Sequence, residues 1–276
     1  MTNKNPLVSV VMPVYNSEKY LAEAIESVLN QSFKNFEFII VDDDSADTSV
    51  EIIKKYAQRD KRIKILYNKK NFGIAKTRNR GILEAKGKYI ATHDSDDIST
   101  LNRFQMQVKY LEEHCNVGVV GNYIEIFSEN HDNTSVRKYP ENDKDLRRMI
   151  FFACPIAQPT SMIRKEVFEK VGLYNKKYPP AEDLDLWFRI GTKYELANIP
   201  KVLLKYRESL FSATAAKTRL MEKLSLKIRF KNCKNPMYNF NSKAFLYNSL
   251  HLLSLFIIPS KLKILLFQKI RDKKNV

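Results

Sequence analysis

One stretch of the sequence joins a predicted strand to an acidic cluster, Gly87-Lys88-Tyr89-Ile90-Ala91-Thr92-His93-Asp94-Ser95-Asp96-Asp97. Tyr89 to Thr92 form an apolar run of residues that favour strands, and the end of the stretch places three carboxylates within four positions. Such a cluster repels itself unless a cation or several hydrogen-bond donors lie among the carboxylates. At the end of a strand, Asp94-Ser95-Asp96 suits a hard divalent ion whose remaining ligands are the phosphates of a substrate. The alternative is an acidic turn that caps a helix beginning near Leu101.

Strands alternate with helices in the N-terminal part of the chain. Apolar runs predict strands at residues 7–12, 36–41 and 63–67, and the stretch quoted above supplies the fourth. Segments of helical periodicity fall between them, which is the pattern of parallel βαβ units. Ligands of open parallel sheets bind beyond the C-terminal ends of the strands. Two strands end there in acidic clusters, at 42–44 and 94–97, as a site for a nucleotide and a metal ion requires.

The following part of the chain mixes helices and strands. Its pattern predicts helices at 101–114 and 144–152, strands at 117–127, 160–163 and 202–206, and a polar loop at 128–142. A further helix is predicted to begin at Glu182 and Asp183, because two prolines precede an acidic first turn. These two carboxylates are either caps of that helix or functional groups.

Basic charge is concentrated at the C-terminal end. The 276 residues carry a formal net charge of +16, of which residues 217–276, with 14 Lys and Arg against two acids, contribute +12. We therefore divide the chain into residues 1–216 and a basic C-terminal segment, residues 217–276. Such a segment indicates nucleic acid or an anionic membrane surface as a partner. Its apolar run at 244–258 is shorter than the ~20 residues that a membrane-spanning helix needs.

The sequence lacks the motifs of several common metal, phosphate and dinucleotide sites. The three cysteines show no paired spacing, so neither a disulfide framework nor a zinc knuckle is indicated, and a reducing cytoplasm is the default compartment. No P-loop is present, and no G-x-G-x-x-G follows the first strand. His93 lacks a companion at zinc-ligand spacing. Phosphate charge is therefore expected to be neutralised by a metal and by side chains such as Arg78.

Five stretches of the sequence resemble the family 2 glycosyltransferases, which have the GT-A fold. They are Val8-Ser9-Val10-Val11-Met12-Pro13-Val14-Tyr15-Asn16, Ile39-Ile40-Val41-Asp42-Asp43-Asp44-Ser45-Ala46-Asp47-Thr48, Asn71-Phe72-Gly73 with Arg78-Asn79-Arg80-Gly81, Gly87 through Asp97, and Ala181-Glu182-Asp183-Leu184-Asp185-Leu186-Trp187. Each is weak alone, but five in the family's order, over roughly residues 7–210, are specific. We therefore expect an α/β fold of the GT-A class, a Rossmann-like, mixed and mostly parallel sheet flanked by helices in residues 1–216. The C-terminal segment adds a basic amphipathic helical tail.

The resemblance implies a nucleotide-sugar site built from the first strands. Asp43, supported by Asp42, would accept a hydrogen bond from the uracil or ribose, and Arg78 would face the base or a phosphate. The residues that would line the base pocket are Pro13, Tyr15 and Asn16. The family usually has Gly or Asn where this chain has Asp44, a residue that also tolerates a positive φ but adds charge.

The resemblance also implies the metal site and the base. Asp94-Ser95-Asp96 corresponds to the D-x-D motif, with Asp96 as the direct ligand of Mn²⁺ or Mg²⁺ and with Asp94 and Ser95 also contacting the donor. Glu182-Asp183 corresponds to the ED motif, and Asp183 would be the general base. Inverting transfer needs one carboxylate to take the proton of the acceptor hydroxyl, while the metal carries the charge of the departing diphosphate. Relatives often have a histidine where this chain has Glu208, which puts a contact from that position in doubt.

We therefore predict an inverting, metal-dependent glycosyltransferase. Its donor would be a nucleotide-diphospho-sugar, namely a UDP-sugar. It would move the sugar to a hydroxyl of a glycan or lipid-linked acceptor in the synthesis of surface polysaccharide or lipooligosaccharide. One alternative is a nucleotidyltransferase, although the first strand lacks the Gly-rich basic loop that such enzymes use. The other is a nucleic-acid-binding protein, although the aromatic residues are not interleaved with the basic ones, so no nucleic acid is expected. The expected location is cytoplasmic, peripheral on the cytoplasmic face of the inner membrane, with the C-terminal segment on anionic lipid.

Overall fold

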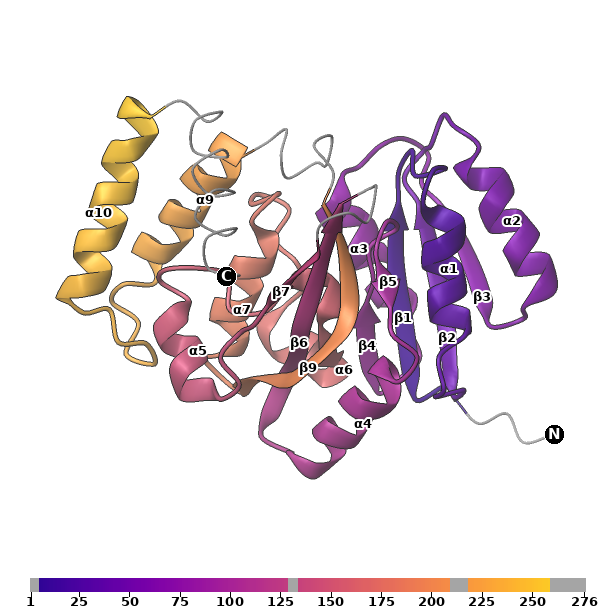
Figure 1. Ribbon diagram of the computed structural model, residues 1–276, viewed down its shortest axis with the longest axis horizontal. Coiled ribbons are helices and arrows are strands. Elements are labelled where there is room, and N and C mark those ends of the chain that lie inside the picture. Colours follow the sequence, from indigo (N-terminus) through magenta and orange to yellow (C-terminus); the bar gives the residue numbers. More distant parts are fainter. Residues whose placement is uncertain (1–4, 129–133, 209–217, 259–276) are drawn as a thin grey trace.

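A computed structural model describes residues 5–128, 134–208 and 218–258 (Figure 1). Within these ranges the strands form one mixed sheet in the order β3-β2-β1-β4-β8-β6-β9-β5, and β7 pairs with β6. The strands are β1 (Val8–Val14), β2 (Phe36–Asp42), β3 (Ile63–Tyr67), β4 (Tyr89–Thr92), β5 (Ile98–Ser99), β6 (Val117–Ser128), β7 (Thr134–Arg137), β8 (Met162–Arg164) and β9 (Glu195–Glu208). Helices cover both faces of the sheet, as Figure 1 shows, so the predicted α/β architecture is confirmed.

The N-terminal half is the predicted series of parallel βαβ units. Strands β1 to β4 pair in parallel, and β1 is buried along its whole length, which explains its continuous apolar sequence. The connecting helices are α1 (Leu21–Leu29), α2 (Ser49–Arg59) and α3 (Ile74–Glu84). The apolar residues of α3 join the core on one face of the sheet, and those of α1 and α2 join the core on the other. All four strands therefore end at one edge, where the acidic clusters lie.

Strand β8 connects the two halves of the sheet. It runs antiparallel to β4 on one side and to β6 on the other. Its last residue, Arg164, is buried, and its guanidinium donates to the carbonyl oxygens of Val117 (2.8 Å) and His114 (3.0 Å). The arginine side chain thus ties the end of β8 to the start of β6 and to the residues just before it.

Several elements of the second half differ from the predictions. Strand β5 was not predicted, β7 lies within the predicted loop, and α6 (Lys165–Val171) begins directly after β8. Strand β9 starts seven residues earlier than predicted and runs past Pro200. Its register against β6 shifts around that proline, so a break in the ladder accommodates the residue that has no N–H to donate. The other helices are α4 (Arg103–Glu113), α5 (Asp143–Met149), α7 (Glu182–Ile190), α9 (Thr218–Lys231) and α10 (Ser242–Ile257), with a 3₁₀ turn at Gln158–Thr160.

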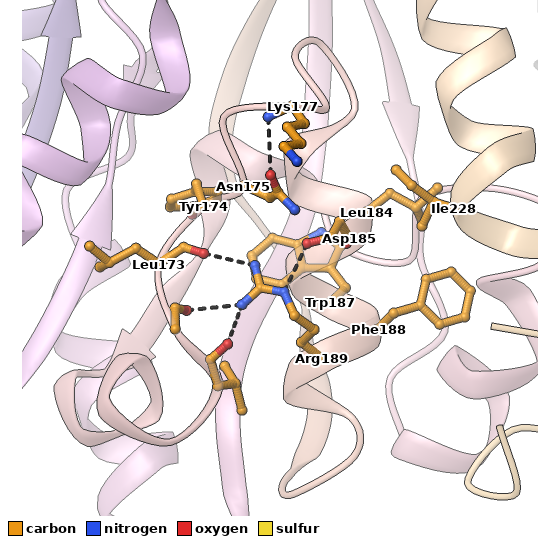
Figure 2. Close-up of polar contacts among 12 residues, drawn as sticks. Leu173, Tyr174, Asn175, Lys177, Leu184, Asp185, Trp187, Phe188, Arg189 and Ile228 are labelled. Atoms are coloured by element: carbon orange, nitrogen blue, oxygen red, sulfur yellow. Dashed lines mark hydrogen bonds and ion pairs between the residues drawn. The ribbon is translucent and has the colours of Figure 1, made fainter. Parts of the chain in front are cut away.

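The helices of the C-terminal segment pack on the rest of the protein. Helix α9 lies between α7 and α10 (Figure 1), and Ile228 of α9 joins the same core cluster as Leu184 and Phe188 of α7 (Figure 2). Tyr238, between α9 and α10, donates its hydroxyl to the carbonyl oxygen of Phe188 at 2.8 Å. Across the described residues, every helix falls short of the length and hydropathy that a bilayer-spanning segment requires. The division at residue 216 stays a prediction, but the helices beyond it share the main core.

The shared core predicts that α9 unfolds together with the sheet. Replacing Ile228, which is fully buried, with Ala should lower the free energy of unfolding by roughly 2–5 kcal/mol. Urea unfolding followed by the fluorescence of Trp187, the single tryptophan and a buried residue of α7, measures this directly. The control is Leu250→Ala on the exposed side of α10, which should change stability by less than about 0.5 kcal/mol. An unchanged Trp187 transition in Ile228→Ala would mean that the C-terminal helices unfold separately.

Candidate active site

The acidic turn after β4 is held from two directions. The backbone N–H of Arg207, near the end of β9, donates to Oδ1 of Asp97 at 3.0 Å, and the guanidinium of Arg207 donates to the carbonyl oxygen of Asp96 at 3.0 Å. The hydroxyls of Ser95 and Ser17 lie 2.7 Å apart and tie the turn to the loop after β1. Arg207 was not predicted as a site residue, because it follows the turn by more than a hundred positions in the chain.

The charge of this turn fits a cation. Burial raises the pKa of Asp96 to about 6, and the negative charge of Asp94 adds to the effect. Burial, together with the charges of Asp96 and Asp94, also raises the pKa of Asp97 well above its ordinary value. A divalent ion would favour the ionised forms. In the described ranges no three His, Cys, Asp or Glu side chains are grouped to hold an ion.

The loops after β1 and β2 hold each other at the same edge. Asn16 has a φ of 48°, and its side-chain oxygen accepts from the N–H of Ala46 at 2.8 Å. Asp44 has a φ of 68°, which confirms that this turn needs a left-handed residue. Asp42 supports the turn with Oδ2, which accepts from the backbone N–H groups of Asp44 (3.2 Å) and Ser45 (3.3 Å). Pro13 is buried within β1, whereas the Tyr15 side chain is half exposed at the edge.

Asp43 organises the loop that precedes α3. Its Oδ1 accepts from the Asn68 amide (2.6 Å) and the N–H of Phe72 (2.9 Å), and its Oδ2 accepts from the N–H of Gly73 (2.8 Å). The amide of Asn68 also donates to the Thr77 hydroxyl at 3.1 Å. Three donors therefore already surround the Asp43 carboxylate, and its contact with a base or ribose stays a prediction. Asn68 was missed, since a single Asn after a strand carries no distinctive sequence signal.

Arg78 connects the acidic turn to the start of α7. It is buried, its Nη2 lies 3.1 Å from Oδ1 of Asp94, and its Nη1 lies 3.1 Å from Oε1 of Glu182. The guanidinium also lies over the ring of Tyr174, 5.2 Å from its centroid. Burial alone would lower the pKa of Arg78, but the neighbouring carboxylates raise it above its ordinary value. Both Nη atoms are thus engaged with carboxylates, and the predicted role beside a base or phosphate stays a prediction.

Asp183 has a different environment from its neighbour Glu182. Its Oδ1 accepts from the N–H of Leu184 at 2.7 Å, and its Oδ2 accepts from the thiol of Cys154 at 3.4 Å. Burial raises the pKa of Asp183 to about 6, and the charge of Glu182 adds to the effect. Glu182 instead uses one oxygen to bind Arg78. Cys154 was not predicted as a site residue.

Arg189, in the last turn of α7, holds the start of the loop that precedes this helix. Arg189 donates to the backbone carbonyls of Val171, Gly172 (3.0 Å) and Leu173 (2.8 Å), and Figure 2 shows its bond to Leu173. Its Nε donates to Oδ2 of Asp185 at 2.8 Å, also drawn in Figure 2. Asp185 of the predicted motif is therefore a structural residue, and with Arg189 it anchors the loop next to Glu182 and Asp183.

The predicted site residues thus gather at one edge of the sheet. The loops after β1 and β2 contact each other, the Ser17–Ser95 contact joins them to the acidic turn, and Arg78 joins that turn to α7. The arrangement offers carboxylates with raised pKa values at two places, the turn and the start of α7. The carboxylates of the turn can associate with a cation, and the carboxylate at the start of α7 can accept a proton near neutral pH.

Comparisons with known proteins identify the family and the fold. The family described as glycosyl transferase family 2 matches residues 9–172. An uncharacterized glycosyltransferase of Methanocaldococcus jannaschii is 36% identical over 280 residues, which cover 98% of this chain and 95% of the relative. The structure of S. aureus TarS 1–349 in complex with UDP has a TM-score of 0.67 at 21% identity, covering 92% of this chain and 73% of TarS 1–349.

A mannosyltransferase of Pyrobaculum calidifontis, PcManGT in complex with GDP-Man and Mn²⁺, has a TM-score of 0.66 at 15% identity. The match covers 97% of this chain and 81% of that protein. Likeness at these identities shows the fold, and it confirms the predicted GT-A architecture of a mixed sheet flanked by helices. With the family match over residues 9–172 and a relative that aligns along almost the whole chain, this protein belongs to glycosyl transferase family 2 and is a glycosyltransferase.

Proposed function

We propose that this glycosyltransferase is inverting and metal-dependent, and that it transfers a sugar from a UDP-sugar to a hydroxyl group of a glycan or lipid-linked acceptor. The observation that carries the proposal is the pair of carboxylate sites joined by buried Arg78, the turn with Asp94 on one side and the Glu182-Asp183 pair on the other. The turn suits the charged donor, and Asp183 suits the proton of the acceptor. Family membership decides against the two alternatives, a nucleotidyltransferase and a nucleic-acid-binding protein.

The donor is proposed to bind along the loops after β1, β2 and β4. TarS has been solved with UDP and with UDP-GlcNAc, and PcManGT with GDP-Man, which supports a nucleotide-sugar as the donor. In our proposal the half-exposed Tyr15, together with Pro13 and Asn16, lines the base pocket. Asp42 and Asp43 support the base or ribose through the loops that they organise.

Mn²⁺ or Mg²⁺ is proposed to associate with Asp96 and Asp94. When bound, the ion would supply positive charge that stabilises the diphosphate leaving group. The raised pKa of Asp96 and the pairing of Asp94 with Arg78 fit this assignment, because each shows a carboxylate that gains from nearby positive charge. Ser95, bound to Ser17, would fix the backbone between the two ligands.

Asp183 is proposed as the general base. In a single displacement it takes the proton from the acceptor hydroxyl, the hydroxyl oxygen forms the bond to the anomeric carbon, and the bond to the diphosphate breaks on the opposite face. The anomeric configuration is therefore inverted. Glu182 is the less suitable base because its carboxylate is committed to the ion pair with Arg78.

The same proposal includes the pathway of the acceptor and the place of the enzyme in the cell. We place the enzyme in the synthesis of surface polysaccharide or lipooligosaccharide, in the cytoplasm and peripheral on the inner membrane. The net charge of +12 in the C-terminal segment supports contact with anionic lipid. A growing glycan or a lipid-linked sugar would then be close to the enzyme.

The proposal predicts a strict requirement for the metal. Asp96→Asn should lower sugar transfer by about 100-fold or more, because it removes a negative ligand that would hold the metal ion, and the ion would stabilise the leaving group. Release of UDP from a panel of UDP-sugars, with GDP-sugars for comparison, measures the effect in the presence of Mn²⁺ or Mg²⁺. Asp60→Asn, far from the site in a surface pair with Arg62, is the matched control and should keep full activity. Full turnover in excess EDTA would contradict the proposal.

The assignment of the base predicts a selective loss of turnover. Asp183→Asn keeps the size and the acceptor oxygen but removes basicity, so kcat should fall by roughly 10²–10⁴-fold. The affinity for UDP, measured by calorimetry with metal present, should stay within a few-fold of wild type. Glu182→Gln retains an acceptor for Arg78 and should lose less activity. Near-normal turnover of folded Asp183→Asn would move the base elsewhere.

The pKa of Asp183 predicts the acidic limb of the pH profile. The carboxylate is protonated below its pKa of about 6 and cannot then accept a proton, so kcat/KM should decline as the pH falls through that value. Initial rates at saturating metal across the acidic to neutral range measure the limb. If the wild-type rate stayed constant through this range, the group with the raised pKa would not be the base.

A further inference from the structure

The outward side of α10 is apolar and exposed. The side chains of Phe256 and Ile257 are 79% and 76% exposed, and those of Leu250 and Leu253 are 57% and 56% exposed. The full set of large apolar residues on this side, called the α10 apolar face from here on, is Phe245, Leu246, Leu250, Leu252, Leu253, Phe256 and Ile257. Single exposed leucines are normal on protein surfaces, but a continuous set on one helix marks an interaction site.

The inward side of the same helix is the more polar one. Ala244, Asn248 and Leu255 are buried, and Asn248 donates from its amide to the carbonyl oxygen of Phe151 at 2.9 Å. His251, on the same side, lies 3.4 Å from Glu222 of α9. A surface helix ordinarily turns its apolar side to the core, so α10 has the reverse arrangement. Packing on the catalytic domain does not account for its apolar residues.

The helical segment that carries the α10 apolar face is basic. Lys223 and Lys227 on α9, Lys234 in the following turn and Lys243 at the start of α10 are all exposed. Among residues 218–258 the sequence contains a single acidic residue, Glu222, whose carboxylate faces His251. A partner for this surface must therefore accept both apolar side chains and several positive charges.

We propose that the α10 apolar face inserts into the interface of an anionic lipid bilayer. An anionic bilayer offers hydrocarbon to the leucine and phenylalanine side chains and negative headgroups to the lysines. A second copy of the chain fits less well, because it would bring a second segment of +12 without acidic partners. The inference rests on the membrane attachment in the proposed function and assigns it to a defined surface.

Helix α10 would lie parallel to the membrane surface and would not cross the bilayer. A helix of 16 residues is about 24 Å long, shorter than the ~30 Å hydrocarbon layer, and its inward side is held by α9 and by Phe151. Because Tyr238 and Asn248 bind carbonyl groups of the catalytic domain, α10 cannot reorient independently. The bilayer contact would thus set the orientation of the whole enzyme on the surface.

The test is flotation of the full-length protein with lipid vesicles. Vesicles of phosphatidylcholine alone are compared with vesicles containing added phosphatidylglycerol, at low and high salt. Leu250→Glu combined with Leu253→Glu changes two exposed residues, so folding should be retained, and binding to the anionic vesicles should fall by about tenfold or more for each leucine. The matched control is Leu83→Glu on α3, where the leucine is 71% exposed, and it should bind like wild type.

The outcomes separate the possibilities. Loss of binding in the double variant alone supports the inference. Equal binding of wild type and double variant overturns it and leaves attachment to the basic residues. Absence of wild-type binding overturns both this inference and the proposed attachment, and a wild-type dimer that the double variant abolishes would identify the surface as an interface between copies. UDP release from UDP-sugar, measured in solution on each variant, tests the proposed transfer reaction independently of every lipid result.

Discussion

The structure of the site depends on one buried charge, the guanidinium of Arg78. It pairs with Asp94 of the acidic turn after β4 and with Glu182 at the start of α7, and these two carboxylates lie 88 positions apart in the chain. Removing a buried cation from two carboxylates leaves uncompensated charge, which costs far more than the pair contributes to stability. The positions of the acidic turn and of the start of α7 are therefore linked, and neither can move without affecting the other.

The carboxylates of the site differ in their surroundings. Asp43 has three donors around it and Asp42 has two backbone N–H groups, so both mainly shape loops. Asp96 and Asp183 lie where burial opposes their charge, and the pKa of each is raised to about 6. The acidic residues thus divide into those that organise the loops at the edge of the sheet and those whose ionised form is opposed by burial. All of them look alike in the sequence.

The sequence predicted the parts of the fold that local patterns determine. Strands β1 to β4 were placed correctly because each is rich in apolar residues, and the acidic ends of β2 and β4 located the site edge. Strand β5 has only two residues and β7 is mostly exposed, so neither has a pattern to recognise. Arg207, Asn68 and Cys154 were missed because their roles arise from contacts between distant segments, which spacing along the chain does not reveal.

The short strand β8 has a consequence for how the sheet tolerates substitutions. Strands β1 to β4 come from one continuous segment, whereas α7 and its neighbours come from later in the chain. In the described sheet the two parts meet across β8, whose three residues are all buried and whose backbone pairs with β4 on one side and with β6 on the other. A residue in β8 that could not be accommodated would therefore disturb the pairing of both parts at once, although the strand is among the shortest in the described sheet.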